Sequence, residues 1–203
     1  MPQTIADGKN QELLIGALAS LLQAKPFDAI TVTDITRTAK VGRTTFYSYY
    51  QDKYDLIEHL ENAHIEAFCE LLTASRRDTP RAYLNNLREP QAYYLTCFYT
   101  YVQQNIGVLS VLFSPSHNTN FMHRMDDAVA RHRRETLQMW GIGNPTQFYW
   151  GRALAGVHLT LTRAFIRQSP ALSPEEMSEI ATGIFRSLLA GILAPESVQL
   201  PPE

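Results

Sequence analysis

Cysteine and net positive charge are both scarce in this sequence of 203 residues. The two cysteines, Cys69 and Cys97, stand far apart, without the close spacing of a zinc site or a redox pair. We expect them to be reduced side chains in the protein interior. The formal net charge is −2, so the chain lacks the excess of basic residues that is usual in nucleic-acid-binding proteins. Any contact with nucleic acid would therefore depend on a local cluster of cations.

Several motifs that carry chemistry are also absent. The sequence has no glycine-rich phosphate loop, no serine elbow and no cluster of metal ligands, which disfavours an enzyme and predicts no metal and no cofactor. The histidine pairs 59/64 and 117/123 are not spaced to share one helical turn, so we expect isolated surface histidines. The run 131–134, Arg-His-Arg-Arg, alternates with acidic residues at i, i+4 spacing, which indicates a solvated helix face.

Long hydrophobic runs are absent too. The one apolar stretch near the N-terminus, 13–22, is amphipathic and is interrupted by Gly16 and Ser20. It suits neither a signal peptide nor a membrane span. With 45% hydrophobic and 19% charged residues, the composition is that of a folded globular protein. We expect a cytoplasmic protein that does not contact the membrane.

Helical periodicity runs through the whole sequence, and no strand pattern competes with it. Apolar spacing, prolines and glycines predict helices at about 10–25, 32–39, 43–50, 53–73, 91–104, 106–113, 120–139, 146–168 and 174–193. The polar segment 76–90 is the expected connection, with its conformation left open. The predicted fold is all-α, with an N-terminal domain over 1–60 and a C-terminal helical bundle over 61–203.

Two short helices separated by three residues are the most informative pattern. Thr31 and Asp34 form a T-x-x-D capping box before the first of them, and Gly42 is an acceptable N-cap for the second. This spacing predicts a helix-turn-helix within a three-helix domain. Between Thr36 and Lys53 there are four cations and one anion, a local balance of +3, so a DNA footprint should lie there.

The second short helix has two chemically different sides. One side carries Phe46, Tyr49 and Tyr50, and the other carries Thr44, Tyr47 and Ser48, with Arg43 at the helix start. The aromatic side is suited to packing. The other side offers a guanidinium, hydroxyls and a phenol, which suit base edges and phosphates better than a core.

The stretch Pro26-Phe-Asp-Ala-Ile-Thr-Val-Thr-Asp-Ile35 through Thr45-Phe-Tyr-Ser-Tyr-Tyr-Gln-Asp-Lys-Tyr-Asp-Leu-Ile57 closely resembles the DNA-binding domain of the TetR/AcrR family. The resemblance covers about 10–60 and is strongest to the branch typical of Firmicutes, which includes activators of dihydroxyacetone kinase operons. Two residues depart from the pattern. Lys40 replaces the usual turn glycine, at some cost if its φ is positive, and Gly42 replaces the usual serine or asparagine cap.

Carried over position by position, the resemblance implies a set of DNA-binding residues. Arg43, Thr44 and Ser48 would face base edges, while Thr31, Thr45, Tyr47 and Lys53 would address phosphates. Lys53 would be helped by the positive end of the helix that it begins. The alternatives are a solvated surface charge for Arg43 and Lys53, packing for Tyr47, and capping alone for Thr31.

The resemblance further implies a homodimer on a palindrome of double-stranded DNA. We expect helices 146–168 and 174–193 to form a two-helix-per-subunit interface, because Gly151, Ala155 and Gly183 permit close approach. Relatives of this kind often bind a small-molecule effector in the C-terminal bundle. The candidate lining, with ordinary aromatic core as the alternative, is Tyr94, Phe98, Tyr101, Met125, Trp150 and His158.

The sequence therefore predicts a transcriptional regulator, either a repressor or an activator. It would bind a palindromic operator specifically as a homodimer and would be modulated by an effector of unidentified chemistry. The alternative is a helical protein-interaction module that keeps the TetR fold but does not bind DNA. The negative net charge and the atypical Lys40 and Gly42 leave that alternative open.

Overall fold

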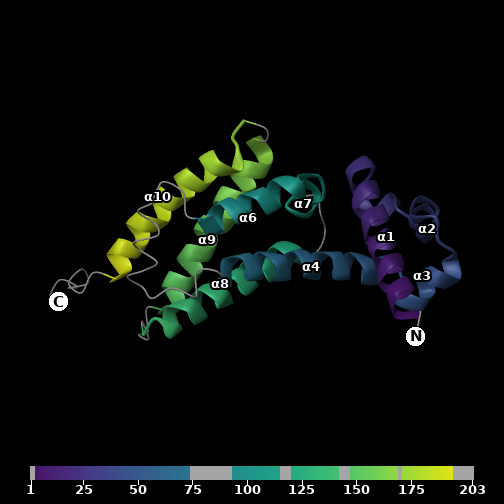
Figure 1. Ribbon diagram of the computed structural model, residues 1–203, viewed down its shortest axis with the longest axis horizontal. Coiled ribbons are helices and arrows are strands. Elements are labelled where there is room, and N and C mark those ends of the chain that lie inside the picture. The colour runs from purple at the N-terminus through teal and green to yellow at the C-terminus, as the bar shows by residue number, and fades with distance from the viewer. Residues whose placement is uncertain (1–2, 74–92, 115–119, 142–146, 169–170, 194–203) are drawn as a thin grey trace. The chain divides into compact units, whose positions relative to one another are not determined.

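The computed structural model describes residues 3–73, 93–114, 120–141, 147–168 and 171–193, and the regular structure in these ranges is helical throughout (Figure 1). The all-α prediction is confirmed. The elements are α1 (Gln3–Ala24), η1 (Phe27–Ala29), α2 (Val32–Ala39), α3 (Arg43–Tyr49), α4 (Lys53–Thr73), α6 (Tyr93–Gln104), α7 (Ile106–Leu112), α8 (Phe121–Met139), α9 (Gln147–Gln168) and α10 (Pro174–Leu193).

Most helices begin and end where the capping residues and prolines predicted. Pro26 follows the end of α1, and α10 begins with a reciprocal cap in which Ser173 Oγ accepts from Glu176 N at 3.2 Å and Glu176 Oε2 accepts from Ser173 N at 2.7 Å. The first helix begins seven residues earlier than the predicted 10–25. The first residues of α1 are helical but carry no apolar stripe. Since the prediction of this helix start depended on such a stripe, it placed the start too late. The predicted connection 76–90 lies outside the described residues.

The chain divides into two compact units. Unit 1 contains α1, α2, α3, α4 as far as Glu66, and residues 105–122 with α7. Its core is built from side chains with no exposed surface: Leu14, Leu18, Ile30, Ile35, Phe46 and Leu56. Helix α7 packs on α1 so closely that a Cβ added at Gly107 would lie 2.6 Å from the Gln23 side chain. The expected domain boundary near residue 60 remains a prediction.

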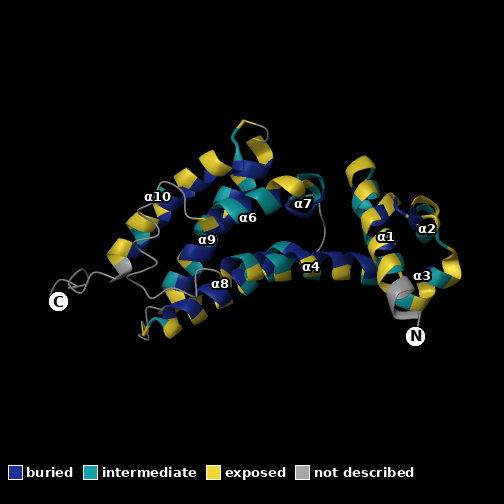
Figure 2. Ribbon diagram, in the orientation of Figure 1, coloured by how far each residue is buried: buried dark blue, intermediate teal, exposed yellow. Residues whose placement is uncertain are grey.

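Unit 2 contains the end of α4 and the helices α6, α8, α9 and α10. Buried and exposed positions alternate along these helices, as expected for amphipathic helices around a core (Figure 2). In α9, Gly151 lies against α8, with its Cβ position 3.2 Å from the Ala130 carbonyl oxygen, and Ala155 is fully buried. The expectation that these two small residues serve approach between subunits is therefore wrong, because the chain uses them for its own packing.

Two further expectations concern reactivity and membranes. Cys69 and Cys97 are not joined in a disulfide, and both are half-buried rather than fully enclosed as expected. Within the ranges that the structure describes, every helix is too short or too polar to cross a bilayer.

Candidate nucleic-acid interface

The predicted capping box is present at the start of α2. Thr31 Oγ1 accepts from Asp34 N, and Asp34 Oδ2 accepts from Thr31 N, each at 3.1 Å. The Thr31 hydroxyl also donates to Asp34 Oδ2 at 2.8 Å. Its single hydrogen therefore points at the carboxylate, so Thr31 would have to rotate its hydroxyl to donate to a phosphate.

Asp34 joins α2 to the preceding segment. Lys25 Nζ lies 2.8 Å from Asp34 Oδ2, and Arg37 Nη2 lies 2.9 Å from Asp34 Oδ1. The hydrogen bond from Lys25, followed by those from Thr31, holds the pKa of the Asp34 carboxyl well below its usual range. The carboxylate thus stays ionised and forms ion pairs with two cations, Lys25 and Arg37.

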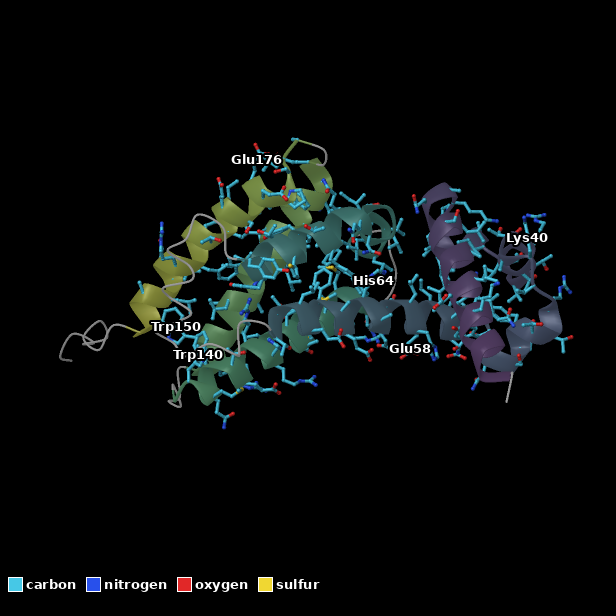
Figure 3. The ribbon with its side chains drawn as sticks, in the orientation of Figure 1. Lys40, Glu58, His64, Trp140, Trp150 and Glu176 are labelled. Atoms are coloured by element: carbon cyan, nitrogen blue, oxygen red, sulfur yellow. The ribbon has the colours of Figure 1, made fainter. Side chains whose placement is uncertain are left out.

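The turn between α2 and α3 has the strained conformation expected of it. Lys40 adopts φ 57° and ψ 38°, the left-handed region, and its N–H donates to the Thr36 and Arg37 carbonyls. A non-glycine residue in this conformation costs roughly 1–2 kcal/mol. Gly42 then takes the extended N-cap conformation of α3, as predicted, with no side chain to cap the helix. The Lys40 side chain is exposed on this turn (Figure 3).

Helix α3 separates its two faces as predicted. Phe46 is 0% exposed and Tyr50 is buried, whereas Tyr47 is 58% exposed. Thr44 and Ser48 are exposed with Tyr47, and Thr45 is half-buried. The alternative that Tyr47 is a packing residue therefore does not hold within this chain, since its ring meets Phe46 edge to face but is mostly exposed.

Arg43 and Ser48 are held in place by local hydrogen bonds. Arg43 Nη2 donates to Thr33 Oγ1 on α2 at 2.6 Å, which ties the start of α3 to the neighbouring helix. Ser48 Oγ donates to the Thr45 carbonyl at 2.7 Å, so its oxygen faces outward as an acceptor. The outward face thus presents a partly positioned guanidinium beside hydroxyl groups.

Lys53 makes contacts that its position in the motif did not suggest. Its Nζ donates to the carbonyls of Phe27 at 3.1 Å, Asp28 at 3.1 Å and Ile30 at 2.9 Å. The ammonium also lies 4.8 Å from the centre of the Phe27 ring. An ammonium has three hydrogens, so these carbonyls use its full donor capacity. Lys53 fixes the η1 connection that leads into α2.

The positive end of α4 is occupied as well. Asp52 Oδ1 accepts from Tyr54 N at 2.8 Å and from Asp55 N at 2.9 Å. The two amides that would favour an anion at this helix start are therefore bonded to the protein's own carboxylate. A cation at a helix N-terminus is electrostatically unfavourable, and that is the one sequence signal that pointed to an internal partner for Lys53.

The six residues predicted to line an effector pocket all lie on unit 2 helices, where Phe98 of α6 contacts His158 of α9. Tyr94, Phe98, Met125 and His158 are buried, while Tyr101 and Trp150 are half-buried. The Phe98 and His158 rings lie 5.3 Å apart, and burial raises the pKa of Tyr101 to about 12. A small cavity in this unit is lined by none of the six predicted residues. The effector site remains a prediction.

The run 131–134 on α8 does not form one solvated face. Arg131 and Arg134 are exposed as predicted, but His132 and Arg133 are buried. At about 100° per residue, four consecutive positions pass around the whole helix and two of them must face inward. The described residues contain no group of three potential metal ligands.

Comparison with known proteins gives the family. Residues 14–60 match the model of the N-terminal domain of bacterial regulatory proteins of the tetR family. This N-terminal domain belongs to the tetR family. The matched residues include the capping box, the Lys40 turn, all of α3 and Lys53, which are the features described above.

Two curated proteins are also similar to this chain. Over 47 residues the chain is 38% identical to the dhaKLM operon transcriptional activator DhaS of Lactococcus lactis, covering 23% of this chain and 25% of that protein. It is 24% identical to the HTH-type transcriptional regulator YxbF of Bacillus subtilis, covering 69% of this chain and 47% of that protein. The chain therefore spans less than half the length of both curated relatives.

A solved structure shows the shared fold. The TetR transcriptional regulator of Streptococcus agalactiae 2603V superposes with a TM-score of 0.60, at 21% sequence identity, over 91% of this chain and 97% of that one. The similarity includes the C-terminal helices as well as the tetR domain. The expected helix-turn-helix followed by a helical domain is confirmed at the level of the fold.

Proposed function

We propose that this protein is a sequence-specific DNA-binding transcriptional regulator that inserts α3 into the major groove of its operator. The observation that carries the proposal is the outward face of α3, where Arg43, Thr44, Tyr47 and Ser48 are exposed while Phe46 anchors the helix in the core. An α-helix fits the major groove, and its exposed side chains reach base edges and phosphates there.

Base recognition is assigned to three of these residues. The Arg43 guanidinium matches the O6 and N7 acceptors of guanine, and releasing its bond to Thr33 would free the donor for a base. Thr44 and Ser48 offer a methyl group and hydroxyl oxygens at the same face. We expect Arg43→Ala to lose affinity and relax sequence preference at one position, at a cost of about 1–3 kcal/mol of discrimination.

Phosphate contact is assigned to Thr31 at the start of α2 and to Thr45 and Tyr47 on α3. Tyr47→Phe removes only the phenol oxygen, so it should weaken binding to operator and to random DNA by the same factor. For Lys53 we propose a positioning role, since its ammonium already bonds three carbonyls. Both assignments are tested by anisotropy titration of operator and random duplexes.

We propose a homodimer through α9 and α10 that binds a palindrome. On α10 the predicted apolar stripe divides into two faces: Ala181 and Phe185 are buried, whereas Ile180 is 46% and Ile184 is 36% exposed. Gly183 between them has open space around its Cβ position. Exposed isoleucines on both sides of a glycine support close contact with a second copy.

The dimer proposal is tested by sedimentation of Ile180→Glu together with Ile184→Glu. We expect a folded monomer with greatly weakened operator binding, since each half-site then has to be bound separately. The control Met139→Glu alters an apolar side chain on α8 that is even more exposed, at 65%, and should remain dimeric. Dimerisation of the double variant would overturn the assignment.

The regulator itself is tested with labelled upstream DNA at two salt concentrations and with random DNA as competitor. Specific, salt-sensitive binding is expected, because phosphate contacts release counterions. Arg131→Ala, an exposed arginine on α8, is the control for Arg43→Ala. A folded dimer that shows no preference over random DNA would favour the protein-interaction module instead. Whether DNA binding represses or activates follows from the position of the operator.

A further inference from the structure

Two exposed arginines of α8 lie away from every residue assigned to DNA or to the dimer. In the run 131–134, Arg133 turns into the core, where its Nη2 meets Nε2 of the buried His158 on α9. Burial lowers the pKa of His158 well below its usual value, so its imidazole is neutral and accepts from the arginine. Arg131 and Arg134 lie on the exposed side of α8. At i, i+3 spacing they are neighbours on the helix surface.

These two arginines border a groove between α8 and α9. The groove measures about 210 Å³, and about 10–15 Å³ is enough for one water molecule, so it has room for a small organic molecule. Its described lining shares no residue with the predicted effector pocket, which makes it a separate site. The lining consists of Asp127, Ala130, Arg131 and Arg134 from α8, and of Phe148 and Arg152 from α9.

Close packing of the two helices brings the third arginine to the groove. Gly151 directly precedes Arg152 on α9. A Cβ placed on this glycine would lie 3.2 Å from the Ala130 carbonyl oxygen and 3.3 Å from the Arg134 amide nitrogen. The backbone of α9 therefore approaches α8 at the position of Arg134, and a larger residue at 151 would crowd it.

The ion pairs of the groove leave it basic. Arg152 Nη1 donates to Asp126 Oδ2 at 2.6 Å and to Asp127 Oδ1 at 2.8 Å, which holds this guanidinium in a defined position. Asp127 thus bonds the neighbouring helix instead of Arg131, which is its i, i+4 neighbour in the sequence. The three arginines and the two aspartates together carry a formal charge of +1.

We infer that this groove binds the phosphate group of a small phosphate monoester, held by Arg131 and Arg134 beside the fixed Arg152. A phosphate monoester carries a charge of about −1.5 to −2 at neutral pH and three strong acceptor oxygens, which arginine can bond in pairs. Its organic part would lie against Phe148, whose ring is 51% exposed at the groove. A carboxylate has less charge and fewer oxygens, so it would use fewer of these donors.

The surroundings of the groove favour a small ligand over a polyanion. Asp126 and Asp127 bind Arg152 at one side, and the exposed Glu135 follows Arg134 on α8. These carboxylates would repel the successive phosphates of a nucleic acid and the side chains of an acidic protein segment. A single phosphate group can lie between the arginines without meeting them.

The first test is calorimetry of the unaltered chain at about pH 7.5, where the ester is mainly a dianion. Phenyl phosphate should bind about fivefold more tightly than phenyl sulfate, a monoanion of the same shape, which is the effect of one further charge near water. Phe148→Ser should weaken phenyl phosphate and leave the affinity for inorganic phosphate unchanged. That difference separates contact with the organic part from contact with the phosphate.

Variants of the two exposed arginines test their role. Arg131→Met together with Arg134→Met should weaken phenyl phosphate at least about tenfold, since two charge-assisted contacts are lost. Arg131→Lys with Arg134→Lys keeps the charge but not the paired bonds, so its affinity should be intermediate. The matched control, Arg167→Met with Arg186→Met, removes two exposed arginines outside the lining and should bind normally. Circular dichroism checks that each variant is folded.

Several results would overturn the proposal. These are no saturable binding of phenyl phosphate up to about 10 mM, a range that reaches very weak ligands, or equal weakening in the arginine variant and its control. Tighter binding of a hexaglutamate peptide than of phenyl phosphate would also overturn it and would identify an acidic protein segment as the ligand. The titrations contain no DNA, so a failure of operator binding leaves this site intact, and a failure of phosphate binding leaves the regulator intact.

Discussion

The two units differ in how they accommodate polar side chains. In unit 1 the charged groups meet protein partners of complementary chemistry: Asp34 bonds Lys25 and Arg37, and Lys53 bonds three carbonyls. In unit 2 the guanidinium of Arg133 lies in the core against a neutral imidazole and an aromatic ring. The first pattern builds and orients a helix-turn-helix. The second encloses a cation in a helical core, where removing it from water is costly.

The largest effect is expected at Lys53. Lys53→Met keeps the aliphatic stem but leaves three carbonyls without their donor, one of them in the buried Ile30. We expect the free energy of unfolding to fall by about 2–4 kcal/mol, measured by urea denaturation. Arg43→Met, which loses one exposed hydrogen bond, should change it by less than about 0.5 kcal/mol.

DNA binding separates the positioning role of Lys53 from a phosphate contact. At a temperature where Lys53→Met remains folded, the salt dependence of its binding to random DNA should match that of the unaltered chain. Loss of a phosphate contact would instead reduce the slope of log K against log salt by about 0.9. A reduced slope with unchanged stability would restore the family-implied phosphate contact.

The polar pair in unit 2 should behave in the opposite way. His158→Leu removes the acceptor of Arg133 Nη2 and should cost about 1–3 kcal/mol, because a buried donor loses its partner. Replacing both residues, with Arg133→Met and His158→Leu, should bring stability back to within about 1 kcal/mol of the unaltered chain. A double variant as unstable as the sum of the single variants would show that the pair is a structural requirement of the core.

Much of the fold and part of the site could be predicted from the sequence, for reasons that are local. Two helices begin with capping boxes, formed by Thr31 with Asp34 and by Ser173 with Glu176. Because these hydrogen bonds join residues only three positions apart, the sequence alone predicts where the helices begin. Helical phase likewise separated Phe46 from Tyr47 on α3.

Other features depend on contacts between distant segments. The carbonyls bonded by Lys53 lie 23 to 26 residues before it, in a connection whose path only the fold defines. The burial of Arg133 depends on which side of α8 faces α9, which a run of four polar residues does not reveal. Gly151 of α9 was predicted at a subunit interface for the same reason, although the chain packs it internally against α8.

A smaller change is expected when Asp34 becomes Asn. Its depressed pKa means that the ionised carboxylate stabilises the fold above the ordinary aspartate pKa of about 3.9, and that this contribution is lost as pH falls below that value towards the folded pKa. The stability difference between the unaltered chain and Asp34→Asn should thus be largest near neutral pH and shrink in acid. Asp28→Asn, which removes the charge of an exposed carboxylate in η1, is the matched control. A pH-independent difference would contradict the assigned ion pairs.

The smallest effect concerns the turn. Lys40→Gly removes a Cβ from the left-handed region and should stabilise unit 1 by about 0.5–1 kcal/mol, because relief of strain exceeds the added entropy of the unfolded glycine. Lys40→Ala loses the same charge but keeps the strain, so it should be no more stable than the unaltered chain. Equal stability of the glycine and alanine variants in urea would contradict the strain. Both variants could also bind random DNA more weakly than the unaltered chain, and to the same extent. In that case Lys40 is retained for its charge at the edge of the α3 face, which explains why the strained turn holds a lysine.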